Sequence, residues 1–82
     1  MNPNWGYAIG QSPDGWLVMY LCAGGDESDE EILAHGLANA AHFQADPATV
    51  RVVRWYTQTP EEHQLLLNFL AVWSGRVERG EV

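Results

Sequence analysis

The histidines are the first residues to consider for metal or acid–base chemistry. His35 and His42 are seven residues apart, so in a helix they would share a face about 10 Å apart along the axis. That separation is too large for both imidazoles to bind one zinc ion directly. His63 falls in another segment. We therefore expect solvated histidines, no metal ligand and no metal requirement for folding.

Cys22 is the only cysteine, so the chain has no internal disulfide. A cysteine nucleophile needs a base or a helix N-terminus close to its sulfur, and the sequence places neither there. We expect Cys22 to act as a small, half-buried apolar residue.

A glycine pair and a run of carboxylates follow Cys22. Gly24-Gly25 lies between a predicted strand and a helix start, where phosphate-binding loops occur. The carboxylates would repel a phosphate there, and the chain has no Gly-x-Gly-x-x-Gly and no Lys-Ser/Thr pair. The spacing also lacks the twelve-residue pattern of a calcium-binding EF-hand loop. We expect no nucleotide or other cofactor.

Two interpretations of the acidic run stay open. Carboxylates near a helix start stabilise the positive end of its dipole, and the run can serve that purpose alone. It can also dock a basic partner, including a nucleic-acid-binding protein whose phosphate contacts the carboxylates imitate. In that case the partner-binding residues of the run are Asp26, Glu27, Asp29 and Glu30.

Length and composition limit the classes of protein. The 82 residues predict one compact domain over 1–82, and 46% hydrophobic residues exclude a disordered chain. A net charge of −7 argues against direct nucleic-acid binding, which depends on cationic side chains. No apolar run reaches the roughly 18 residues of a membrane span. The N-terminal residues lack signal-peptide features, so we expect a cytoplasmic protein.

A β-hairpin is predicted near the N-terminus. Residues 5–10 alternate large and small side chains, residues 12–15 (Ser-Pro-Asp-Gly) form a type I turn, and residues 16–22 form a second strand. A three-residue loop pairs Ser12 with Trp16 and Ala8 with Tyr20. In that register Trp16, Val18 and Tyr20 lie across the small residues of the first strand. The opposite face carries the large residues Trp5, Tyr7, Ile9, Leu17, Met19 and Leu21.

Two helices and a third strand follow the hairpin. Ser28 with Glu31, and Thr59 with Glu62, have capping-box spacing, so helices begin after Ser28 and at Pro60. The first ends near Asp46-Pro47. Residues 49–57 are rich in β-branched and aromatic side chains and predict a strand that is half apolar on both sides. We expect the charged tail, residues 76–82, to fray.

These elements predict an α+β fold in the order β-β-α-β-α. We expect a mainly antiparallel three-stranded sheet with strand order 2-1-3 and with both helices on one face. The uncovered face then exposes Trp16, Val18 and Tyr20, which a partner or a second copy would cover. The alternative exchanges the faces and places Tyr20 under the helices, with Tyr7 outside.

The function expected from these features is that of a small acidic protein–protein interaction module without enzymatic activity. It would occupy a partner's surface, as the inhibitors encoded by phages and mobile elements do. One alternative is a small enzyme or ligand-binding protein with a pocket lined by Trp5, Tyr7 and Trp55. Another is a purely structural homodimer.

Overall fold

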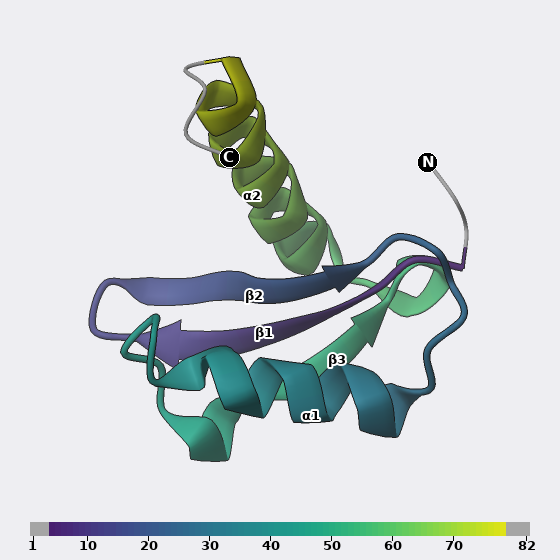
Figure 1. The fold of residues 1–82 in the computed structure, drawn as a ribbon, viewed down its shortest axis with the longest axis horizontal. Coiled ribbons are helices and arrows are strands. Elements are labelled where there is room, and N and C mark those ends of the chain that lie inside the picture. The colour runs from purple at the N-terminus through teal and green to yellow at the C-terminus, as the bar shows by residue number, and fades with distance from the viewer. Residues whose placement is uncertain (1–3, 79–82) are drawn as a thin grey trace.

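The computed structural model describes residues 4–78. The predicted α+β class and element order are confirmed, and β1 lies between β2 and β3, antiparallel to both (Figure 1). None of the helices in this part of the chain is long and apolar enough to cross a membrane. The elements are β1 (Gly6–Ser12), β2 (Gly15–Cys22), α1 (Asp29–Ala40), β3 (Arg51–Arg54) and α2 (Pro60–Glu78), with 3-10 turns η1 (Pro47–Thr49) and η2 (Trp55–Thr57) on either side of β3.

Both predicted capping boxes are present. Ser28 caps α1, because its hydroxyl accepts a hydrogen bond from the Glu31 amide while its own amide donates to the Glu31 carboxylate. At α2, the Thr59 amide donates to Glu62 Oε1 over 2.7 Å, and the Glu62 amide donates to Thr59 Oγ1 over 3.2 Å. These side chains therefore satisfy amides that the first turns of the helices leave without partners.

The helix ends differ from those predicted. α1 ends at Ala40, before a turn in which Gln44 has a φ of 56° and the Ala45 amide donates to the Ala40 carbonyl. α2 continues through Ser74 to Glu78, so residues 76–78 of the predicted frayed tail are helical. The rest of that tail, residues 79–82, lies outside the described residues.

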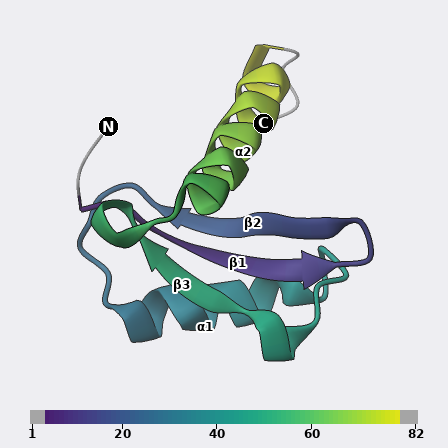
Figure 2. The same cartoon turned by 180° about the vertical axis from the view of Figure 1, so that it is seen from behind.

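The two helices lie on opposite faces of the sheet, so the expectation that they share one face is wrong (Figures 1 and 2). α2 packs on Tyr7 and Ile9 through Leu66. α1 packs on the other face, where its Ile32 contacts Ala8. All residues from Gly6 to Gly10 are buried, which requires a cover on each side of β1.

The hairpin register differs from the predicted one near the turn. Ser12 pairs with Gly15 instead of Trp16, so the loop contains only Pro13 and Asp14. The register shifts by one residue at a β-bulge between Ala8 and Ile9, and Ala8 then pairs with Tyr20 as predicted. Met19 is the extra residue of this bulge.

The bulge places residues that were predicted to share one face of β2 on two opposite faces of the sheet. Val18 packs in the core cluster beneath α2, and Trp16 borders the same helix. Tyr20 and Cys22 pack instead with Ile32 of α1 on the other face of the sheet. A one-residue shift reverses the faces of all residues beyond it, which explains this division.

Close approach of α1 to the sheet depends on Gly36. A β-carbon at this position would lie 2.6 Å from Cβ of Ala8 and 3.1 Å from Cγ1 of Val50. Gly36 is buried in the helix interior, where glycine costs about 1 kcal/mol relative to alanine. The missing side chain therefore lets the helix contact the small-residue face of β1.

We predict that Gly36→Ala destabilises the fold by roughly 1–3 kcal/mol, because overpacking outweighs the gain in helix propensity. Thermal unfolding followed by circular dichroism measures the change. The control is Ala34→Gly on the exposed side of α1, which should cost about 1 kcal/mol through propensity alone. A Gly36→Ala chain that melts above the wild type would contradict the close contact.

Candidate interaction surface

The structure separates the three β2 residues that were predicted to bind a partner. Trp16 is 40% exposed on the α2 side, whereas Val18 is 3% exposed and belongs to the core. Tyr20 lies on the α1 side, where its ring stacks on His35 with 4.4 Å between ring centroids. Tyr7 is fully buried beneath α2. Neither predicted arrangement of faces is therefore correct, because each tyrosine lies on a face that a helix covers.

An apolar groove lies between β2 and α2. It encloses about 220 Å³ and has no charged residue in its lining. β2 and α2 provide most of the lining, and Phe43 from the segment after α1 completes it. The lining residues are Trp16, Leu17, Val18, Phe43, Leu65, Asn68, Phe69 and Val72.

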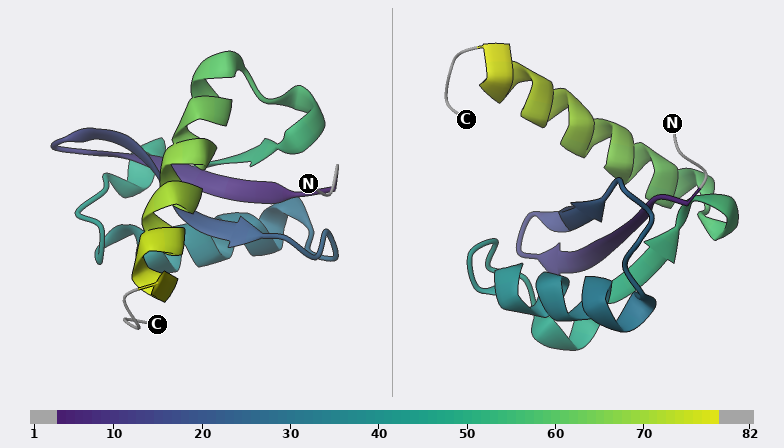
Figure 3. Two further views of the ribbon diagram at one scale, coloured as in Figure 1. Left: turned by 90° about the horizontal axis from the view of Figure 1, so that it is seen from above. Right: turned by 45° about the vertical axis from the view of Figure 1, so that its right-hand side comes forward.

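The C-terminal half of α2 extends beyond the sheet (Figure 3). Leu66, near the start of the helix, is fully buried, whereas Val72 is 60% and Trp73 is 45% exposed. Leu65, Phe69 and Trp73 are spaced by four residues and therefore lie along one side of the helix. The projecting half thus presents an apolar face that the described chain does not cover.

A buried carboxylate anchors the start of α2. Glu62 is 7% exposed and forms an ion pair with Arg51 of β3. Burial alone would raise the pKa of Glu62, but the Thr59 amide and the Arg51 guanidinium outweigh it and hold that pKa below its usual value. Burial and the nearby Glu62 charge raise the pKa of Tyr7 to about 12, so its hydroxyl stays protonated and donates to Gln58.

We predict that Glu62→Gln lowers the stability by about 1 kcal/mol at pH 7, because the charged hydrogen bonds to the carboxylate are lost. The folded-state pKa of Glu62 is depressed, so its contribution is present above the ordinary value of 4.5 and is lost as the pH falls through the lower folded-state pKa. The wild type and the variant should therefore converge in acid.

Melting temperatures measured across this pH range test the convergence. Glu61→Gln is the matched control, since Glu61 is exposed in the same helical turn. A difference in melting temperature between Glu62→Gln and the wild type that stays constant as the pH falls would contradict the depressed pKa of Glu62.

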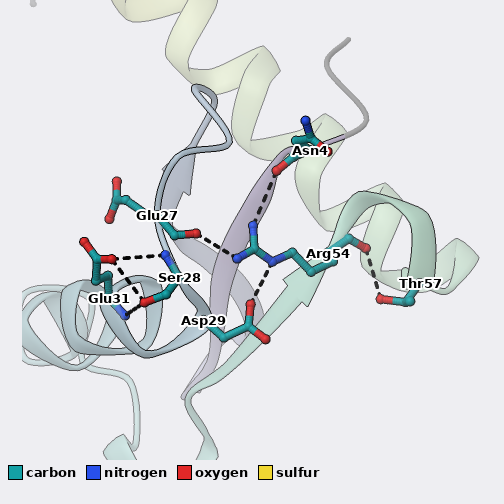
Figure 4. A network of polar contacts seen from close by, with 7 residues as sticks. All are labelled: Asn4, Glu27, Ser28, Asp29, Glu31, Arg54 and Thr57. Atoms are coloured by element: carbon teal, nitrogen blue, oxygen red, sulfur yellow. Dashed lines mark hydrogen bonds and ion pairs between the residues drawn. The ribbon is translucent and has the colours of Figure 1, made fainter.

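The acidic run is tied to the fold through Arg54 (Figure 4). The guanidinium donates from Nε to Asp29 Oδ1 over 2.7 Å and from Nη2 to the Glu27 carbonyl over 2.8 Å. It also donates to the Asn4 carbonyl over 3.4 Å.

Other carboxylates of the run have different contacts. Glu31 serves in the capping box, and the Glu27 carboxylate accepts from the Tyr20 hydroxyl. Glu30 is exposed. Docking of a basic partner on this run stays a prediction.

The aromatic residues proposed as a pocket lining pack against one another instead. The rings of Trp5 and Trp55 meet edge to face with 6.4 Å between centroids, and both side chains pack against the cluster that contains Tyr7. The apolar groove beside α2 is lined by other residues and not by Trp5, Tyr7 or Trp55. Sequence reasoning missed this groove because it depends on where α2 leaves the sheet, although the apolar run of residues 65–73 was a signal of it.

Comparison of the chain with protein-family models, with curated proteins and with solved structures found no match.

Proposed function

We propose that this chain is a non-enzymatic protein-interaction module that recognises partners through α2 and the groove beside it, and that its partner there is a second copy of the chain. The observation that carries this proposal is the uncovered apolar face of the projecting half of α2. In this half of the helix Val72 is 60% and Trp73 is 45% exposed, and Trp16 beside the groove is 40% exposed. An apolar surface of this kind is typical of protein interfaces.

The size of the groove favours a protein side chain over a small molecule as its occupant. Ligand pockets usually enclose about 300–1,000 Å³ and bury most of the ligand. The groove encloses about 220 Å³, which suits one large side chain. Aromatic side chains that fill such pockets are frequent anchors of protein interfaces.

The charge distribution allows a second copy to be the partner. Two chains that each carry a net charge of −7 repel one another unless they meet through uncharged surfaces. The groove lining contains no charged residue, and α2 has none from Gln64 to Ser74. This surface therefore allows two copies to approach without bringing carboxylates together.

The spacing on α2 suits a two-fold interface. In a symmetric dimer, residues equally distant from the axis on opposite sides contact one another. If two antiparallel α2 helices cross at Phe69, Trp73 of one copy lies opposite Leu65 of the other, because each is four residues from Phe69. Trp73 of each copy can then enter the groove of the other, which Leu65 and Phe69 line.

We predict that Trp73→Glu raises the dissociation constant of the dimer at least about 30-fold, corresponding to the loss of roughly 2 kcal/mol at an interface hot spot. Sedimentation equilibrium over a series of concentrations measures this constant. The matched control is Tyr56→Glu, because Tyr56 is also an exposed aromatic residue, at 72%, but it does not line the groove.

Circular dichroism must show that both variants keep the helical content of the wild type. A wild-type chain that sediments as a monomer throughout the series would refute the dimer. Equal weakening by the Trp73 and Tyr56 substitutions would instead refute the assignment of the interface to α2.

A further inference from the structure

Three metal-ligating side chains gather at the end of β2, on the opposite side of the sheet from α2. The Cys22 sulfur, one carboxylate oxygen of Asp26 and one of Glu27 all lie within 4.8 Å of one another. Cys22 is 4% exposed, and its Sγ lies 3.6 Å from Asp26 Oδ1. The turn through Gly25, which has a φ of 74°, brings the two carboxylates back towards the sulfur.

The spacing of Cys22 Sγ and Asp26 Oδ1 fits two ligands of a tetrahedral zinc site. Zinc lies about 2.3 Å from a thiolate sulfur and about 2.0–2.2 Å from a carboxylate oxygen, so two such ligands at a tetrahedral angle are about 3.5 Å apart. The observed distance from Cys22 Sγ to Asp26 Oδ1 is 3.6 Å. One ion can therefore reach both atoms with little movement of either side chain.

Arg54 forms no ion pair with the side chains of this cluster. Arg54 donates to the backbone carbonyl of Glu27 and to the carboxylate of Asp29, not to the side chains of the cluster. Oε1 of Glu27 is buried and accepts no hydrogen bond from the described residues, and it forms an ion pair with His35 Nε2 at 3.2 Å only when His35 is protonated. Beside a neutral His35, a bound cation would satisfy this buried oxygen.

The neighbouring side chains hold Glu27 in place. The Tyr20 hydroxyl donates a hydrogen bond to Glu27 Oε2. The Tyr20 ring stacks on His35 with 20° between the planes. Such outer contacts orient the ligands of metal sites.

We propose that Cys22, Asp26 and Glu27 bind a divalent transition metal, with zinc as the best fit. A thiolate beside carboxylates suits zinc, whereas calcium and magnesium take oxygen ligands. The bound ion would join the end of β2 to the segment that precedes α1. This proposal departs from the sequence-based expectation of no metal ligand, which considered the histidines, the cysteine and the carboxylates separately.

Cobalt(II) titration tests the site in the intact chain, because a thiolate bound to cobalt gives a charge-transfer absorption that carboxylates alone do not. We expect the wild type to develop this absorption and zinc to abolish it by displacement. Cys22→Ser should lose the absorption, and Asp26→Asn should weaken zinc binding at least about tenfold in calorimetry. Asp14→Asn, at the hairpin turn, is the matched control and should bind like the wild type.

Two outcomes would overturn the proposal. One is a wild type that shows no thiolate-to-cobalt absorption. The other is zinc binding that Asp26→Asn and Asp14→Asn weaken equally, which would mean nonspecific attraction to an acidic chain. Asp26 is exposed, so its variant keeps the test valid if Cys22→Ser fails to fold.

Discussion

Burial of β1 on both of its faces is the constraint on which the arrangement of the other elements depends. One face of the strand carries Gly6, Ala8 and Gly10, and the other carries Tyr7 and Ile9. The small face lets α1 approach until Gly36 contacts Ala8, whereas the large face meets the Leu66 side of α2. With one helix on each face, the chain forms three layers around a sheet of only three strands. A 19-residue helix is about 28 Å long, but three strands spaced about 4.8 Å apart span only about 10 Å between their outer axes. Since α2 crosses the strands, its C-terminal half must extend beyond them (Figure 3).

Much of this fold could be predicted from local sequence signals. The hairpin and both capping boxes depend on residues close together in the chain, such as Ser28 with Glu31. The strand order also requires the pairing of β1 with the distant β3, and it followed from the economy of packing three strands and two helices. The positions of the helices could not be predicted in the same way, because they depend on which sheet faces are buried. Residues 49–57 did contain a signal that the sheet is covered on both faces, since their apolar side chains fall on both sides of the strand. Val52 lies in the cluster beneath α1 and Val53 in the cluster beneath α2, as expected for a strand with two covered faces.

The candidate sites were harder to predict, because one inserted residue decides which side chains meet. The extra residue in β2 at Met19 places Trp16 and Val18 with α2, and Tyr20 and Cys22 with α1. No turn residue or repeat in the sequence indicates this bulge. The bulge places Trp16 beside the apolar groove, and it directs Cys22 towards the face that α1 covers, near the acidic run. The two proposals thus concern different faces of the sheet, and each can fail without the other.

Isotope-filtered nuclear Overhauser measurements on a mixture of labelled and unlabelled chains test the central claim most directly, that α2 extends beyond the sheet to pack on a second copy. These spectra detect only contacts between different copies. The account predicts intermolecular contacts from the Trp73 indole to the Leu65 methyl groups. It predicts none between Leu66 and Tyr7, which pack within one chain. A mixed sample of folded chains without contacts between Trp73 and Leu65 of different copies would contradict it.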